Sequence, residues 1–256
     1  MAGPGAYILD LDGVVYHGRF IIPGAAEIIE RLRAAGSRVV FLTNNATRTR
    51  EDIAAKLDGM GIGCSAGDVI SSAYAASLHI LKQYGPSSFF PIGEQGLVTE
   101  LERAGHTIAG QDVDCVVVGL DRQFTYDKLA AGLDNLRKGA RFIATNTDAM
   151  LPTENDFLPG AGSMVAALAA ASGVEPEVVG KPNRPIMDVL LREYGLEAGE
   201  CTMVGDRLET DILAGNNVGM HTVLVLTGAS RMEDIENSGI RPDTILDSIA
   251  DIGQVV

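Results

Sequence analysis

Hydrophobic and polar residues follow one another along the chain in blocks that predict strands followed by helices. Apolar runs of strand length at 7–11 and 37–42 each precede a segment with helical signals. Between the two runs, apolar residues recur at the i, i+3, i+4 and i+7 positions of a helix: Ala25, Ile28, Ile29 and Leu32. Thr49, with Asp52 three residues later, is typical of a helix start. Alternating strands and helices favour parallel pairing, so we expect an α/β fold with a doubly wound, mainly parallel, Rossmann-like sheet.

The middle of the chain carries its own set of elements. The pattern predicts a helix from about residue 72, strands at 88–93, 113–118 and 141–144, and helices at 96–104, 126–138 and in the alanine-rich segment after Gly162. After Pro176 the first pattern returns, with strands at 178–182, 202–204, 222–226 and 244–246. We therefore expect a core domain formed by 1–74 and 176–256, with a smaller α/β cap domain, 75–175, inserted between them.

Polar residues follow four of the strands expected in the core domain. They are Asp10 and Asp12, Thr43 and Asn44, Lys181, and Asp206 with Asp211 five residues later. Ligands of open α/β sheets bind outside the carboxyl ends of the strands, so these groups are expected to meet. Side chains two apart on a strand point the same way, so Asp10 and Asp12 can share one face. Carboxylates, a hydroxyl and an ammonium group together suit Mg²⁺ and a phosphate.

Each of these motifs has a simpler interpretation when it stands alone. Asp-X-Asp-Gly and Thr-Asn-Asn after a strand are more often turns or helix caps. The segment around Lys181 is not a P-loop, because Pro182 stands where that loop needs Ser or Thr. Their order and their common position at strand ends favour one catalytic site. Asp10 is then the candidate nucleophile and Asp12 the candidate acid and base, while Asp211 acts through water or orients a ligand.

Four segments resemble the motifs of the haloacid dehalogenase (HAD) superfamily: DLDGVVY (10–16), TNNATRT (43–49), GKP (180–182) and GDRLETDILAGNNVGM (205–220). The insertion between the second and third motifs, with TNTD at 145–148 and LPGAG at 158–162, is similar to the C2-type cap of the NagD-like, 4-nitrophenylphosphatase-type branch. The resemblance covers nearly the whole chain. It implies Mg²⁺-dependent hydrolysis of phosphate monoesters through an aspartyl-phosphate.

The resemblance also implies roles for single residues. The metal is expected on Asp10, the Asp12 main-chain carbonyl and Asp206, with Asp211 in support. The phosphate is expected on Thr43, Asn44 and Lys181. In the cap, Asn146 and Asp148 end a strand and can reach the substrate. The stretch 149–157 is where members of the branch are expected to differ in substrate.

Charge and composition narrow the possible partners. The formal net charge of -14 argues against nucleic acid and against an anionic membrane surface. No apolar stretch reaches the 18 residues or so of a membrane span, and the start lacks the pattern of a signal peptide. The three cysteines, Cys64, Cys115 and Cys201, form no CxxC pair, which fits a reducing compartment. We expect a soluble, cytoplasmic enzyme that acts on a small phosphate ester and that can associate into a homo-oligomer.

Other functions remain open from the sequence alone. A phosphomutase or phosphotransferase acting on sugar phosphates needs the same residues. A receiver-like signalling module stores phosphate on an aspartate, although the insertion and Asp12 speak against it. A phosphate-binding protein without turnover is disfavoured by the complete set of four motifs. A zinc site is not expected, because the four histidines are scattered and form no HExxH motif.

Overall fold

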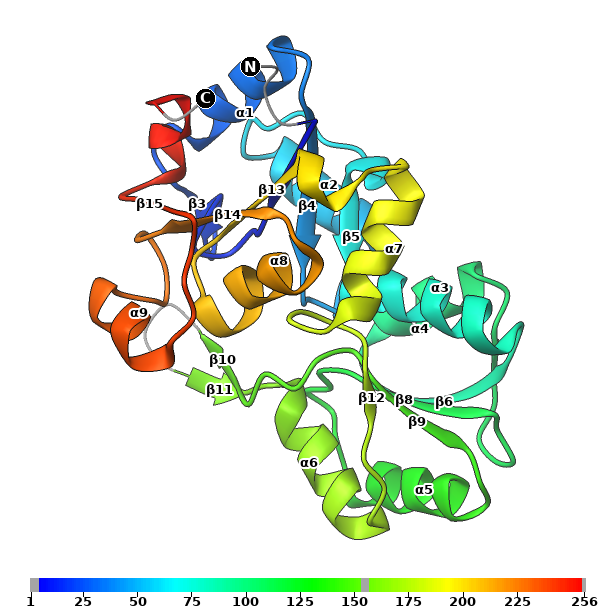
Figure 1. Cartoon of the computed structure of the whole chain (residues 1–256). Helices are drawn as coiled ribbons and strands as arrows, with labels where there is room; N and C mark the ends of the chain where they lie inside the picture. The colour runs from blue at the N-terminus through cyan, green and yellow to red at the C-terminus, as the bar shows by residue number, and fades with distance from the viewer. Residues whose placement is uncertain (1–4, 153–156, 255–256) are drawn as a thin grey trace. The chain divides into compact units, whose positions relative to one another are not determined.

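The computed structural model describes residues 5–152 and 157–254 (Figure 1). It divides into two compact units, which we describe one at a time. The first consists of Met1–Thr43, Ile53–Ile70 and Leu190–Val256, and the second of Asn44–Asp52 and Ser71–Val189. The domain limits expected from the sequence remain a prediction.

The first unit is built around a six-stranded sheet with the order β15-β14-β13-β1-β4-β5. Its strands are β1 (Ala6–Leu9), β4 (Arg38–Thr43), β5 (Val69–Ser71), β13 (Cys201–Gly205), β14 (His221–Val225) and β15 (Thr244–Leu246). From β15 to β4 every neighbouring pair is parallel. The four residues of β1 are all buried, and they pair with β13 on one side and β4 on the other (Figure 1). This strand is therefore the centre of the sheet.

Both faces of this sheet are covered, as the alternation along β14 shows. Val223 and Val225 pack in a cluster with apolar residues of α1 (Ala25–Ala34), α2 (Arg50–Asp58) and the terminal turn η4 (Ile249–Gln254). Leu224 points the other way and packs with the π-helical segment η3 (Leu208–Ile212) and α9 (Met232–Ser238). Helix α8 (Leu213–Val218) continues from η3. The expected α/β, doubly wound arrangement is confirmed.

The second unit has a five-stranded parallel sheet with the order β12-β9-β8-β6-β7. Its strands are β6 (Ser88–Ile92), β7 (Thr107–Ile108), β8 (Cys115–Val118), β9 (Arg141–Ala144) and β12 (Glu177–Val178). Its helices are α3 (Ser72–Tyr84), α4 (Gln95–Arg103), α5 (Tyr126–Arg137) and α6 (Ala161–Ser172). Apolar residues of α5 and α6 form one core cluster with β6, β8 and β9, while α3 packs against α4 (Figure 1). This unit thus has a core of its own.

Strand β12 differs from the sequence-based expectation. A strand at 178–182 was expected in the sheet of the core domain, but β12 covers only Glu177–Val178 and pairs with β9. The pairing continues beyond the strand, because the Val179 N–H donates to the Ala144 carbonyl at 2.9 Å and the Gly180 N–H to the Thr145 carbonyl at 2.9 Å. These hydrogen bonds join the chain before Lys181 to the second sheet. The pattern of apolar residues predicts a strand here but does not show which of the two sheets the strand joins.

Two short hairpins, one further helix and two single turns complete the fold of the described residues. The hairpins β2 (Tyr16–His17) with β3 (Phe20–Ile21) and β10 (Met150–Pro152) with β11 (Phe157–Pro159) are antiparallel. Helix α7 covers Arg184–Tyr194, and η1 (Ala66–Asp68) and η2 (Ala198–Glu200) are single turns. Of the stretch 149–157, residues 153–156 lie outside the described residues. Among the residues that the structure describes, no helix is long and apolar enough to cross a membrane.

Candidate active site

Asp10 lies directly after the central strand of the first sheet. Its main-chain N–H donates to the Val204 carbonyl of β13 at 2.9 Å, so the parallel ladder holds the backbone of this aspartate. On one side of β1 the sheet continues with β4 and β5, and on the other with β13, β14 and β15. The strand order therefore reverses next to β1, and the carboxyl edge at such a reversal is the usual ligand site of a doubly wound sheet.

Three carboxylates meet at this edge. Oxygen atoms of Asp10, Asp206 and Asp211 lie within 4.8 Å of one another. Asp206 follows β13, and Asp211 lies on η3, where its Oδ2 accepts a hydrogen bond from the Arg207 N–H at 3.1 Å. Asp211 is only 1% exposed, so the structure keeps an acidic group out of water next to two others. Such charges repel unless a cation lies between them, and hard oxygen donors are the set that Mg²⁺ prefers. The donor chemistry therefore fits a divalent cation.

Asp12 has different surroundings from Asp10. Its side chain is 66% exposed, and its carboxylate lies 4.0 Å from the His17 imidazole. The chain leaves the strand after Leu9 and turns at Gly13, whose φ of 87° favours glycine, so the two-residue alternation does not continue as far as Asp12. The two aspartates expected to share a face thus differ, one being buried and the other open to solvent.

Thr43 belongs to the same edge of the first sheet. It is the last residue of β4, the strand next to β1, and its side chain is buried. The carboxyl ends of neighbouring parallel strands lie at one edge, which explains why Asp10, Asp206 and Thr43 were found from strand ends in the sequence.

Asn44 and Lys181 are joined in the second unit. The Asn44 side-chain amide makes two hydrogen bonds to the main chain of Lys181: Oδ1 accepts from the Lys181 N–H at 2.8 Å, and Nδ2 donates to the Lys181 carbonyl at 3.0 Å. A Cβ at Gly180 would lie 2.3 Å from the Thr145 carbonyl oxygen, so only glycine permits this approach of the chain. The second and third sequence motifs are thus connected through one asparagine.

Asn146 and Asp148, expected as cap contacts to substrate, both hydrogen-bond to Asn44. The Asn146 amide donates to the Asn44 carbonyl at 2.9 Å, and Asp148 accepts from the Asn44 amide at 3.2 Å. Ser72 adds a further hydrogen bond to the same carbonyl, at 2.6 Å. A role for Asn146 and Asp148 in substrate binding remains a prediction.

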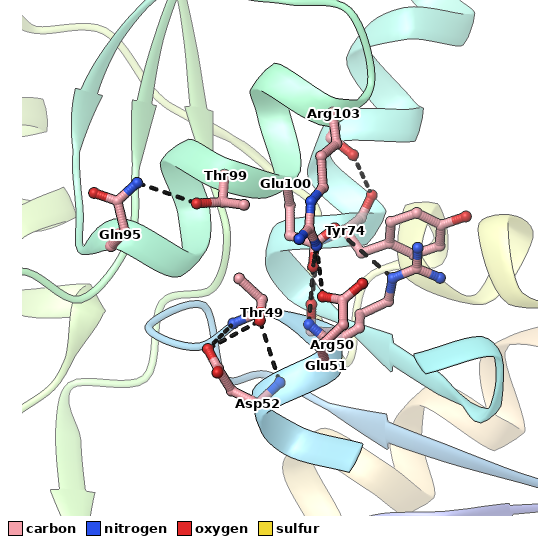
Figure 2. A network of polar contacts seen from close by, with 11 residues as sticks. Thr49, Arg50, Glu51, Asp52, Tyr74, Gln95, Thr99, Glu100 and Arg103 are labelled. Atoms are coloured by element: carbon pink, nitrogen blue, oxygen red, sulfur yellow. Dashed lines mark hydrogen bonds and ion pairs between the residues drawn. The ribbon is translucent and has the colours of Figure 1, made fainter. Parts of the chain in front are cut away.

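A polar network holds the segment that follows Asn44 (Figure 2). Thr49 and Asp52 hydrogen-bond each other at the start of α2, as their spacing predicted. Glu100 of α4, which is 1% exposed, accepts the Arg50 N–H at 2.9 Å and pairs with the Arg50 guanidinium at 3.7 Å. That guanidinium also lies 3.4 Å from the centre of the Tyr74 ring. The charge of Arg50 is therefore paired within the second unit.

The sequence analysis missed one segment of the site, residues 227–230 after β14. The Thr227 hydroxyl donates to the Gly13 carbonyl at 2.6 Å, and the Ala229 N–H donates to the Asp206 carboxylate at 2.7 Å. A signal was present, since Thr227 follows an apolar strand much as Thr43 ends one. It lies outside the four motifs that resemble the family, and a threonine after a strand is not by itself a site signal.

The fold and this cluster define a class of protein, an α/β enzyme with an acidic site at the carboxyl edge of a parallel sheet. Comparison with known proteins gives the family. The model described as haloacid dehalogenase-like hydrolase matches residues 7–107, and one described as HAD-hydrolase-like matches residues 178–252. The chain belongs to the haloacid dehalogenase-like hydrolase family, in its NagD-like branch.

Named relatives agree with this assignment. The chain is 40% identical to the 5'-nucleotidase YutF of Bacillus subtilis (strain 168) over 96% of both chains. It is 42% identical to the acid sugar phosphatase of Staphylococcus aureus (strain MRSA252) over 93% of this chain and 92% of the relative. The structure is similar to a p-nitrophenyl phosphatase from Archaeoglobus fulgidus, with a TM-score of 0.95 and 34% identity over 99% and 100% of the two chains. The expectation of an enzyme of the HAD phosphatase type is confirmed.

Proposed function

We propose that this phosphatase hydrolyses small, soluble phosphate monoesters with Mg²⁺ and through an aspartyl-phosphate formed on Asp10. The observation that carries the proposal is the meeting of three carboxylates at the carboxyl edge beside β1. A structural role for such a cluster is costly, because close negative charges disfavour the folded state unless a cation balances them.

Asp10, Asp206 and the Asp12 main-chain carbonyl are the groups proposed to hold Mg²⁺, with Asp211 in support. The cation, when bound, neutralises negative charge on the phosphate and on the carboxylates. The support for this assignment is the oxygen-only donor set and the burial of Asp211.

In the first step, a carboxylate oxygen of Asp10 forms a bond to phosphorus, and the bond from phosphorus to the ester oxygen breaks. Asp12 gives its proton to the leaving oxygen. In the second step Asp12 takes a proton from water, the water oxygen bonds to phosphorus, and the bond to Asp10 breaks, which restores the carboxylate. The two environments suit these roles, since a buried Asp10 is shielded from water and an exposed Asp12 can exchange protons with it.

Phosphate oxygens are proposed to bind Thr43, Asn44 and Lys181. This assignment comes from the family motifs, and the cap residues Asn146 and Asp148 stay candidates for substrate contact. Cytoplasmic location and association into a homo-oligomer likewise remain predictions.

The direct test is release of phosphate from 4-nitrophenyl phosphate by the whole chain. We expect activity that EDTA abolishes and Mg²⁺ restores, and no activity in Asp10→Asn. Glu27→Gln, a matched change on the exposed side of α1, should behave like the unaltered chain. Activity that survives in Asp10→Asn would remove the nucleophile assignment.

The substrate class is best narrowed with a panel of esters. Two of the relatives are named as a 5'-nucleotidase and an acid sugar phosphatase, so nucleoside monophosphates and sugar phosphates come first, followed by phosphoglycolate and glycerol phosphate. Relative kcat/KM ranks them. Phosphorus NMR of the products separates hydrolysis, which gives free phosphate, from a mutase reaction, which gives an isomeric ester.

A further inference from the structure

The loop of residues 227–230 hydrogen-bonds both to Asp206 and to η3, the segment that carries Asp211. Ala229 donates its N–H to Oδ2 of Asp206 at 2.7 Å, and Ser230 donates its N–H to the Asp206 carbonyl at 3.0 Å. The Ser230 hydroxyl accepts the N–H of Leu208, the first residue of η3, at 3.0 Å. One loop therefore holds the carboxylate of Asp206, its backbone, and the start of the segment that carries Asp211.

The same loop reaches the turn after Asp12. The Thr227 hydroxyl donates to the Gly13 carbonyl at 2.6 Å, across 214 positions of sequence. Gly13 immediately follows Asp12, whose main-chain carbonyl is a proposed metal ligand. The hydroxyl thus fixes the peptide plane next to that ligand, and β14, from which the loop emerges, anchors it to the sheet.

Steric contact limits which residue can follow Thr227. A Cβ at Gly228 would lie 2.0 Å from Oδ2 of Asp206, and a Cβ at Gly13 would lie 2.5 Å from the same atom. The Asp206 carboxylate therefore lies close to two glycine backbones. A side chain at either position would displace it.

We infer that Thr227 is a positioning residue for the metal site, which acts on the turn of Asp12 and Gly13, and that Gly228 is needed for the placement of Asp206. The inference rests on the proposed function, since it concerns how the groups assigned to Mg²⁺ are held. Groups that orient metal ligands typically contribute about 10–100-fold to metal affinity or activity. Neither residue touches the reacting atoms.

The test compares Thr227→Val, Thr227→Ser and Gly228→Ala with the unaltered chain. Valine keeps the shape and removes the hydroxyl, whereas serine keeps the hydroxyl. Binding of Mg²⁺ alone is measured by isothermal titration calorimetry on EDTA-treated protein, and kcat and KM are measured with 4-nitrophenyl phosphate at saturating Mg²⁺. We expect about tenfold weaker Mg²⁺ binding in Thr227→Val and at least as large a loss in Gly228→Ala, with Thr227→Ser within about twofold of the unaltered chain.

Two controls separate positioning from general stability. Thr222, on the preceding strand β14, hydrogen-bonds Asp243 and Asn216, so Thr222→Val loses buried hydrogen bonds away from the site. It should unfold at a lower temperature and bind Mg²⁺ normally. Gly199→Ala adds a Cβ that meets nothing within 4 Å and should change neither property.

The outcomes are distinct for the two proposals. If Thr227→Val binds Mg²⁺ as tightly as the unaltered chain, or if Thr222→Val weakens binding equally, the positioning role is refuted. If the unaltered chain itself binds no Mg²⁺ and releases no phosphate, the proposed function fails instead. Weaker binding in Thr227→Val, rescued in Thr227→Ser, supports the inference.

Discussion

Replacing Asp211 by asparagine should stabilise the metal-free protein and reduce the stabilisation that Mg²⁺ provides. The substitution keeps the size of the side chain and an oxygen that can accept the Arg207 N–H, but it removes one charge from the cluster. Two unit charges 4.8 Å apart repel by about 3.5 kcal/mol at an effective dielectric constant of about 20. Ions and solvent screen part of this repulsion, so we expect a gain of about 1–2 kcal/mol in the metal-free protein.

Mg²⁺ should offset most of this gain, because the variant is expected to bind the cation more weakly. At a concentration 100 times its Kd, a ligand stabilises the native state by about 2.7 kcal/mol, and a tenfold loss of affinity reduces this to about 1.4 kcal/mol. For a chain of this size, 1 kcal/mol moves the melting temperature by about 2–4 °C. Asp211→Asn should therefore melt about 2–8 °C higher than the unaltered chain in EDTA and show a smaller rise when Mg²⁺ is added.

Differential scanning calorimetry in EDTA and in a series of Mg²⁺ concentrations measures both effects. Glu209→Gln is the matched control, because it removes one exposed charge from the same segment, η3. A variant Asp211→Asn that is less stable than the unaltered chain in EDTA, with an unchanged response to Mg²⁺, would refute the idea that these carboxylates repel each other and bind a cation.

Three further predictions concern stability and reactivity. Glu100→Gln should lower the free energy of unfolding by about 2–3 kcal/mol, because it removes the buried carboxylate that pairs with the Arg50 guanidinium, whose side chain is 21% exposed. Urea unfolding measures this against the exposed control Glu102→Gln, and equal stability of the two variants would contradict it. Hydrogen bonds from the Ser88 hydroxyl and N–H lower the pKa of Asp114, so its contribution is present above the carboxyl's ordinary pKa and is lost as pH falls through the lowered one. Asp114→Asn should therefore be less stable at pH 7 and lose less stability on acidification, and unfolding curves of parallel slope against pH would contradict this. Native thiols should react slowly with iodoacetamide at pH 8 and quickly in denaturant, as mass spectrometry of labelled peptides can show, because burial raises the pKa to about 12 in Cys64 and about 11 in Cys115 and Cys201.

Strand ends were the most informative feature of the sequence. Apolar runs that stop at a polar residue predicted β1, β4 and β13, and the parallel arrangement brought Asp10, Asp206 and Thr43 to one edge. The 3.6-residue period and the Thr49 cap likewise predicted α1 and α2 within a few residues. These features can be predicted from a single sequence, because they depend on local sequence and on the burial of one face of each element.

Features that depend on pairing between distant segments were not predictable in this way. The sheet to which β12 belongs is decided by hydrogen bonds to β9, and a two-residue strand carries no periodicity. The different burial of Asp10 and Asp12 follows from a turn after Leu9, which ends the alternation. The loop at Thr227 contacts Gly13 across most of the chain, and a Thr-Gly pair alone is an ordinary loop sequence.

The phosphorylated form of Asp10 can be trapped by quenching the reaction in acid during turnover and reducing the protein with borohydride, which converts an aspartyl-phosphate to homoserine. Asp12→Asn should accumulate this form, because loss of the Asp12 carboxylate slows the attack of water on the aspartyl-phosphate more than it slows the formation of the aspartyl-phosphate from the substrate. We expect homoserine at position 10 by mass spectrometry in Asp12→Asn with Mg²⁺ and substrate, and none with EDTA. Continued phosphate release with no homoserine at position 10, or with homoserine at another aspartate, would contradict nucleophilic catalysis by Asp10.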